Sequence, residues 1–412
     1  MQRLQLVPTT TEQKHRLPVE LYEELGACLP RHDLASFARA TRLTNAVATR
    51  LLYRQIIFSR NTIPEVLLQL FETLATNEDL ARIVVHLEVD WSLRSKHGRN
   101  GRPAHDVHLH MVNGMAAAFV NLANLEHLSI SKALYEGSVF DTPNLLFPRL
   151  REFHFYASGI ELATGIGAFL QRHAANLERL SIFPLYVQLG KLEDTFRGMV
   201  HLQTLRVGHL DALATLMGLS PDGEPPNSVP QEPRPSAATR AVRRIDLAAH
   251  SDDSLRRISA LQTAFPNVRH LNFMRHFLFT AARADDSNIQ TWLGIERLGL
   301  CYCVADGETL GPRFTETLGF CARAFPEVEI LDIFCDCSTM EDDKTDHWER
   351  QSTGSLGKKL LDVVGSSMSR LQLVTFAGRA FTRNLDSPSA PFVSRRLKPS
   401  FDDVPYIPTY LL

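Results

Sequence analysis

The stretch Leu125-Glu126-His127-Leu128-Ser129-Ile130 carries the pattern that decides the fold of this chain. Its apolar residues occupy the first, fourth and sixth positions, a spacing called here the frame. The last two of these apolar residues are two positions apart. A β-strand turns residues with that spacing to the same side, so the frame predicts a short strand with one buried face. The frame recurs along the chain with its first apolar residue at Val84, Leu125, Leu150, Leu177, Leu202, Val242, Val268, Ile295, Val328 and Leu371.

The spacing of the frames indicates a repeat. Five of the nine intervals between successive frames are 25–27 residues long. Helical patterns precede several frames, at residues 160–173, 253–264 and 314–324, and Phe-Pro pairs such as Phe147-Pro148 mark the turn into the strand. A unit of helix, turn and strand cannot bury its apolar face alone, whereas stacked units form one continuous core.

One long interval contains an insertion. Residues 220–240 carry six prolines between Pro221 and Pro235. Such a composition is typical of a linker that cannot bury a core.

Over residues 62–380 this pattern resembles the leucine-rich-repeat family, of the long, helix-backed kind. The resemblance implies a horseshoe with parallel strands inside and helices outside. The family usually has Asn or Cys three residues after the last apolar position of the frame, and only Cys303 fits that rule here. The repeats are therefore degenerate, and the alternative is a non-repetitive α/β domain with chance frames.

Residues 15–58 do not follow the repeat and predict three short helices. The first has an apolar stripe at i, i+4 and i+8, formed by Leu21, Leu25 and Leu29. A second follows Pro30, and a third is expected over residues 45–53. Three short helices have little core of their own, so such a unit often gains stability from a partner.

This segment resembles an F-box, in the order Leu17-Pro18, Glu20-Leu21, Leu25, Leu29-Pro30, Asp33-Leu34 and Phe37. The tryptophan that the family usually has in the middle is absent, because residues 40–44 read Ala-Thr-Arg-Leu-Thr. The resemblance implies docking on the Skp-type adaptor of an SCF ubiquitin ligase and, through it, a cullin. It carries the adaptor-binding role to Leu17, Pro18, Leu21, Leu25, Leu29 and Leu34. The alternative is a helical cap that shields the first repeat.

The predicted organisation is an α/β chain with a small three-helix F-box followed by a degenerate leucine-rich-repeat solenoid. We expect a disordered N-terminus over residues 1–14 and the F-box over 15–58. The repeat domain covers 59–380, with the proline-rich insertion at 220–240, and a C-terminal tail covers 381–412.

Strand alternation predicts which side chains face the concave side. The residues that flank the last two apolar positions of each frame point there. Exposed aromatic side chains are favoured anchors in protein interfaces. We expect a protein substrate to contact Tyr156, Phe183, Arg206, Met274 and Phe334, or these side chains to fold under a loop and serve the core. Arg206, Arg244 and Arg297 are also candidates for contact with a phosphate.

No catalytic, metal or cofactor site is predicted. Cys301, Cys303, Cys335 and Cys337 form two Cys-x-Cys pairs after neighbouring strands, but zinc frameworks usually use Cys-x-x-Cys. His105, His108 and His110 are expected to lie in a solvated loop. No phosphate-binding glycine loop or nucleophile motif occurs.

Composition narrows the class of protein further. The 412 residues carry a net charge of −2, which argues against a dedicated nucleic-acid binder, and six cysteines are too few for a disulfide scaffold. No apolar run approaches the roughly 18–20 residues of a membrane helix, and no secretory signal is visible. We expect a cytoplasmic or nuclear, non-catalytic substrate receptor of an SCF ubiquitin ligase. The alternatives are a scaffold that does not direct ubiquitination and an enzyme or GTPase regulator on the same horseshoe.

Overall fold

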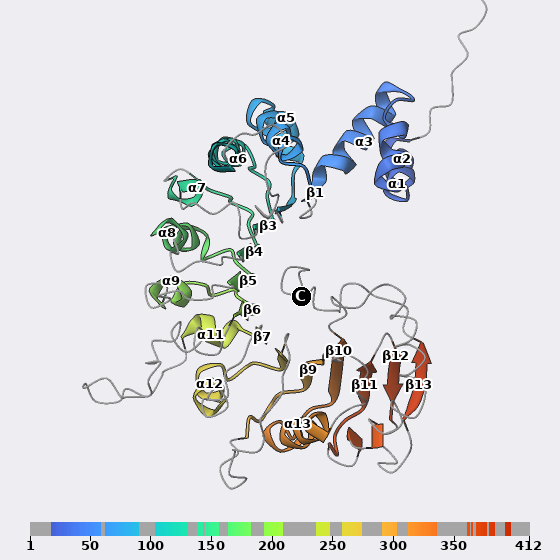
Figure 1. Ribbon diagram of the computed structural model, residues 1–412, viewed down its shortest axis with the longest axis vertical. Helices are drawn as coiled ribbons and strands as arrows, with labels where there is room; N and C mark the ends of the chain where they lie inside the picture. Colours follow the sequence, from blue (N-terminus) through green and yellow to red (C-terminus); the bar gives the residue numbers. More distant parts are fainter. Residues whose placement is uncertain are drawn as a thin grey trace, which may run out of the picture.

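Short strands in chain order form one long sheet in the computed structural model (Figure 1). The structure describes residues 18–58, 62–89, 104–130, 138–142, 145–155, 164–182, 193–208, 236–247, 258–273, 291–302, 312–335, 361–362, 364–365, 368–376, 379–383 and 392–396. The strands are β1 Gln55–Phe58, β2 His86–Val89, β3 His127–Ile130, β4 Glu152–Phe155, β5 Arg179–Ile182, β6 Thr204–Val207, β7 Arg244–Leu247, β8 His270–Phe273, β9 Arg297–Tyr302, β10 Ile330–Cys335, β11 Leu373–Phe376, β12 Arg379–Thr382 and β13 Val393–Arg396.

The sheet is parallel from β1 to β11, and each strand pairs with the next in the chain. The register aligns equivalent positions of the frame, as where Leu128 lies beside Phe153 and Phe153 beside Leu180. This arrangement confirms the prediction of an α/β fold built as a solenoid-like repeat.

The far end of the sheet departs from the prediction. β12 and β13 are antiparallel to their neighbours. The end of β12 and all of β13 lie in residues 381–412, the range predicted as the C-terminal tail. The reason is that Phe381 finds a buried position beside Val374 at the open edge of the last parallel strand.

Helices cover the outer side of the curved sheet (Figure 1). Beyond the first three, they are α4 Pro64–Thr76, α5 Glu78–Ile83, α6 Ala104–Phe119, α7 Ser138–Asp141, α8 Thr164–His173, α9 Glu193–Arg197, α11 Ala237–Ala241, α12 Ile258–Ala264 and α13 Pro312–Ala324. α8 and α12 coincide with the described parts of the helices predicted at 160–173 and 253–264, and residues 160–163 and 253–257 lie outside the described residues.

Two sequence-based assignments were wrong in this layer. His105, His108 and His110 lie in α6 and not in a loop. The range given to the proline-rich insertion includes the start of α11, whose first turn is capped by the side chain of Ser236 on the backbone N–H of Thr239. The prolines themselves lie outside the described residues.

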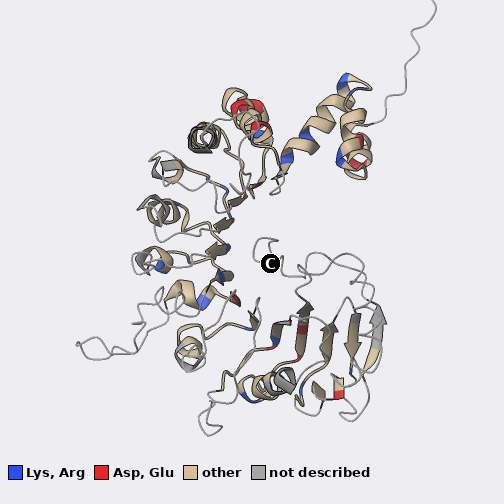
Figure 2. Cartoon of the chain, viewed as in Figure 1, with Lys and Arg blue, Asp and Glu red and all other residues tan. Residues whose placement is uncertain are grey.

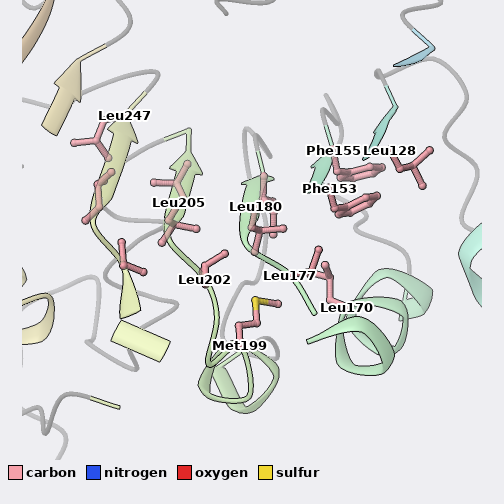
Figure 3. Packing of buried hydrophobic residues seen from close by; sticks show 14 of the residues in the cluster. Leu128, Phe153, Phe155, Leu170, Leu177, Leu180, Met199, Leu202, Leu205 and Leu247 are labelled. Carbon is pink, nitrogen blue, oxygen red and sulfur yellow. The ribbon is translucent and has the colours of Figure 1, made fainter. Parts of the chain in front are cut away.

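The main core lies between the sheet and the helices. The apolar frame residues whose side chains are described lie there and are almost fully buried, and this core extends from Ile56 to Phe381. Figure 3 shows Leu180 and Leu205 on neighbouring strands with Leu170 of α8 on the helix side. Each buried leucine contributes about 1.5–3 kcal/mol relative to an exposed one, so the stacked units stabilise one another.

A buried histidine joins two neighbouring units. His173 at the end of α8 accepts a hydrogen bond at Nε2 from the backbone N–H of Phe147, 2.9 Å away, and its Nδ1 lies 2.8 Å from the carbonyl oxygen of Phe169. Burial lowers the pKa of His173, so the ring is neutral and holds one donor and one acceptor. It therefore links the turn before β4 to the helix of the next unit.

Asparagines at the turns supply further links. The residue just before the first apolar position of the frame is Asn124, Asn176 or Asn267 in three units. Each donates its side-chain N–H to a backbone carbonyl of the preceding unit, at Arg82, Pro148 and Arg240 respectively. Arg82 and Arg240 lie in the last turns of α5 and α11, where backbone carbonyls have no partner within the helix, and Pro148 lies in the turn before β4.

The first three helices form a small unit at the N-terminal end of the solenoid (Figure 1). They are α1 Val19–Ala27, α2 Arg31–Phe37 and α3 Arg42–Arg54. Thr41 and Thr44 form a reciprocal capping box at the start of α3, because each side chain bonds the other's backbone N–H. The buried residues of this unit are Gly26, Leu34, Thr44, Val47 and Ala48.

Close packing at Gly26 sets the position of α1 on α3. A Cβ atom at this residue would lie 2.6 Å from Cδ1 of Leu51. The lack of a side chain therefore lets the two helices approach.

In the part of the chain that the structure describes, no helix is long and apolar enough to cross a membrane.

Candidate interaction surfaces

The outward face of α1 is apolar and exposed. Val19, the first residue of the helix, exposes 44% of its surface, and Leu21 and Leu25, which lie four residues apart on one side of the helix, expose 41% and 53%. They lie exposed because α1 uses Gly26 for its contact with α3. An apolar face of this kind on a unit with so small a core is typical of a protein-binding surface.

The residues predicted to bind an adaptor fall into different environments. Leu17 lies outside the described residues, and Pro18 is exposed at the N-cap of α1. Leu21 and Leu25 are exposed, and Leu29 is partly buried. Leu34 is only 6% exposed and packs in the helical unit, near Gly26. The structure thus brings Leu21 and Leu25 to one surface and gives Leu34 a place in the interior, while their role in binding stays a prediction.

The second candidate surface is the face of the parallel sheet turned away from the helices, called here the inner face. The first and third residues of each strand occupy it, because the second and fourth are buried against the helices. The first residues include His86, His127, Glu152, Arg179, Thr204, Arg244, His270 and Arg297. The third residues include Glu88, Ser129, His154, Ser181, Arg206, Asp246, Asn272 and Asp332.

Three histidines and two glutamates gather at the start of the inner face. The rings of His86 and His127 stack with centroids 3.8 Å apart and planes 4° from parallel. His127 Nδ1 lies 2.9 Å from Glu152 Oε2, and His154 Nε2 lies 3.8 Å from the same oxygen. Two groups, His86 with Glu88 and His127, and His127 with Glu152 and His154, bring their nitrogen and oxygen atoms within 4.8 Å of one another.

The protonation states of this cluster follow from burial. Burial lowers the pKa of His154 to about 4, against the hydrogen bond to Glu152 that favours the charged ring. Burial also lowers the pKa of His127. For Glu152 burial alone would raise the pKa, but hydrogen bonds from His127 and His154 and the charge of Arg179 hold it below its ordinary value. The cluster at neutral pH is therefore two neutral imidazoles beside a carboxylate.

A buried carboxylate organises the middle of the inner face. The side chain of Asp246 is 0% exposed and accepts hydrogen bonds from Arg206 Nε at 2.7 Å and Arg244 Nε at 2.8 Å. Asn272 Nδ2 adds a third, at 2.6 Å. Burial alone would raise the pKa of Asp246, but the two guanidinium groups lower it, so the carboxylate is charged.

A similar arrangement follows at the next strands. Arg297 and the hydroxyl of Thr375 both bond the nearly buried Asp332. Figure 2 shows basic and acidic residues together on the strands of the sheet. The three arginines predicted as phosphate contacts are thus engaged with buried aspartates, so a phosphate group would have to compete with a carboxylate in each case.

Most of the predicted substrate contacts lie outside the described residues: Tyr156, Phe183 and Met274. Phe334 belongs to β10, where its backbone pairs with that of Cys301. Of the set, Arg206 alone has a described side chain, and it pairs with Asp246. A role of these residues in substrate binding stays a prediction.

The cysteine pairs receive little support as a zinc site. The register places Cys335 beside Tyr302 and Cys301 beside Phe334, so these two cysteines are not opposite each other. Cys303 and Cys337 lie outside the described residues.

Sequence reasoning missed the histidine and glutamate cluster. Its signal was the first residue of successive strands, where His86, His127 and Glu152 stand in register. The prediction of substrate contacts used the residues between and just after the last two apolar positions of the frame, and not the first residue of each strand. Comparing the same position in adjacent repeats, and looking for histidine and acidic residues there, would have found the cluster.

Comparisons with known proteins place the chain in no family. No protein-family model matches the sequence, and no curated protein matches it. A solved structure of the Rad7 and Elc1 complex in yeast matches 70% of this chain and 87% of that chain, at 12% identity and a TM-score of 0.24. That TM-score is too low to assign a shared fold. The class that the structure itself defines is a mostly parallel α/β repeat protein with a small helical unit at its N-terminal end.

Proposed function

We propose that this protein is the substrate-recognition subunit of an SCF-type ubiquitin ligase. Helices α1–α3 act as an F-box that docks on a Skp-type adaptor and, through it, on a cullin. The repeat domain holds a protein substrate, and the chain itself carries no catalytic step.

The exposed apolar face of α1 carries this proposal. Leu21 and Leu25 are two of the positions to which the F-box pattern assigns adaptor contact, and both side chains are exposed on the helical unit. Covering them with an apolar partner surface would contribute about 25 cal/mol for each Å² removed from water. The same burial would stabilise a unit whose own core is very small.

The inner face supports the substrate-binding part of the proposal. It presents polar and charged side chains at regular intervals along the strands, and no helix among the described residues lies on this face in Figure 1. A long polar surface on a rigid sheet suits recognition of an extended protein segment.

The test compares two variants in each of which a leucine of similar exposure is replaced by aspartate. Leu25 is 53% exposed on α1, and Leu293 is 55% exposed on the repeat domain. Full-length protein carrying Leu25→Asp should lose co-purification of the Skp-type adaptor and the cullin, because burial of an unpaired carboxylate is unfavourable. Leu293→Asp should retain both partners.

Equal retention of the adaptor by Leu25→Asp and the original protein would overturn docking through α1. A scaffold function is the second candidate, favoured by the extended ladder of polar contacts on the inner face. A stable partner whose cellular level does not rise on proteasome inhibition would support the scaffold over the receptor.

A further inference from the structure

We propose that His127, Glu152 and His154 bind a divalent transition-metal ion of the Zn²⁺ type on the inner face of the sheet. The three residues come from β3 and β4, which are adjacent strands of the rigid parallel sheet. The proposal is independent of adaptor docking, because these strands belong to the repeat domain and not to the helical unit.

The distances between ligand atoms suit one ion. Glu152 Oε2 lies 2.9 Å from His127 Nδ1 and 3.8 Å from His154 Nε2. Zinc bonds to nitrogen and oxygen of about 2.0–2.1 Å place two tetrahedral ligands roughly 3.3 Å apart, which falls between these values. An ion that replaces the proton between His127 and Glu152 therefore requires only small shifts of side chains.

Neighbouring groups orient the ligands. Ser181 Oγ lies 2.6 Å from His154 Nδ1, and this contact holds the ring with Nε2 toward Glu152 Oε2, 3.8 Å away. Arg179 Nη1 binds Glu152 Oε1 at 2.8 Å, which leaves Oε2 to face the two histidines. Partners of this kind fix the tautomer and the ring orientation in established metal sites.

The protonation state of the two histidines and the solvent exposure of the cluster also suit metal binding. Both imidazoles are neutral at pH 7, which is the form that donates to a metal. The side chains of His127, Glu152 and His154 retain 17%, 26% and 12% of their exposure, so solvent can supply a further ligand. Two histidines and one carboxylate are a donor set used by zinc and by other divalent transition metals.

His86 extends the cluster on one side. Its Nε2 is buried, has no hydrogen-bond partner within the described residues, and lies 3.8 Å from Glu88 Oε2. Because the His86 ring stacks on that of His127, it restricts the motion of a ligand ring. We assign the ion to His127, Glu152 and His154 because Ser181 and Arg179 orient that set.

The experiment uses the full chain, purified without a polyhistidine tag and stripped of metal with a chelator. Titration with ZnCl₂ by calorimetry should show one ion per chain. Titration with CoCl₂ should produce the visible absorption of Co²⁺ in a nitrogen- and oxygen-ligated site of low coordination number. His127→Gln and His154→Gln should each weaken zinc binding by at least about tenfold.

His270→Gln is the matched control. His270 occupies the first position of β8 on the same inner face, and burial lowers its pKa as it does for His127. It belongs to neither of the candidate ligand groups among the described residues, so its variant should bind zinc like the original protein. Equal zinc affinity in the original protein and in His154→Gln would overturn the site, as would the absence of zinc binding by the original protein.

Ser181→Ala keeps the test decisive if the histidine variants do not fold. It removes a supporting hydroxyl and no ligand, and should weaken zinc binding by about tenfold. Its thermal unfolding without metal shows whether the fold is intact. A folded Ser181→Ala protein with unchanged zinc affinity, together with no visible Co²⁺ absorption in the original protein, would overturn the proposal.

Discussion

The helical unit and the sheet of this chain obtain their stability in opposite ways. In α1–α3 the interior consists of a few small or medium side chains, while Leu21 and Leu25 stay exposed. In the repeat domain, large side chains such as Phe153 on β4 and Trp292 before β9 are almost fully buried, and polar groups lie on the inner face of the sheet. The two regions contact each other where α3 leads into β1 and where α3 packs against α5.

This difference assigns different tasks to the two regions. A unit that leaves apolar surface exposed and has little core gains from a partner that covers it. A sheet with a continuous core does not need a partner for stability, so its polar face is available for recognition. Changes in the two regions should therefore affect different measurements.

The largest effect is expected from removal of the buried carboxylate of the sheet. Asp246→Ala leaves Arg206 and Arg244 without the acceptor that neutralises them in the interior. Breaking a buried pair in this way costs about 3–5 kcal/mol. Urea unfolding at pH 7, followed by circular dichroism, should show this loss in the transition of the sheet.

A surface pair provides the control for this variant. Glu296 lies 3.6 Å from Arg269, and both side chains are about half exposed. Glu296→Ala should lower the free energy of unfolding by no more than about 1 kcal/mol, because exposed pairs contribute little. A similar small effect of Asp246→Ala would contradict the picture of a sheet organised by buried charges.

The second effect is a loss of sheet stability in acid. The pKa of His154 is about 4 in the folded chain and about 6.5 when unfolded, so the unfolded state binds the proton first as the pH falls. Stability should decrease between about pH 6.5 and pH 4, by an upper limit of about 3 kcal/mol from this group. The lowered pKa of Asp246 acts in the same direction at lower pH.

Unfolding by urea at pH 7 and at about pH 5, with a chelator present, measures this dependence. His154→Gln cannot take up a proton and should show a smaller loss between the two pH values. An equal loss in the variant would assign the acid sensitivity to other groups, such as the neutral and buried His173.

The sequence predicted the sheet well, because its signal is local and repeated. The spacing of apolar residues in the frame alone indicates a strand with one buried face, and ten copies place the strands in order. The predicted helices end where α8 and α12 end, at His173 and Ala264, and the first residues predicted for them, 160–163 and 253–257, lie outside the described residues. The added antiparallel strands depend on the open edge of β11, which no local pattern shows.

The links between units were missed for a related reason. The family pattern directs attention to an asparagine after the strand, whereas this chain has Asn124, Asn176 and Asn267 before the frame. Likewise, the sequence gives no sign that Arg206 pairs with Asp246, which is 40 residues away. The two residues become neighbours only through the register of β6 and β7. Contacts across the sheet require the register, which the sequence supplies only after the strands are aligned.

The smallest effect is expected in the helical unit, and it tests whether this unit is energetically separate. Gly26→Val adds a branched side chain where even a Cβ would lie 2.6 Å from Leu51 Cδ1 and 3.5 Å from Val47 Cγ1. Overpacking of this kind lowers stability by about 1–3 kcal/mol. The loss should weaken the packing of α1 on α3. Hydrogen exchange should increase in α1–α3 and stay unchanged in the strands.

Gly319→Val is the matched control in the repeat domain. Gly319 lies within α13, where an added Cβ would meet, among the described residues, only Arg323 Nη1 at 4.0 Å. A valine there should not destabilise the chain, because valine is more favourable than glycine inside a helix. If Gly26→Val instead lowered the protection of the strands from hydrogen exchange, the helical unit would be part of the cooperative core, and the exposed face of α1 would have to be explained without a partner that stabilises it.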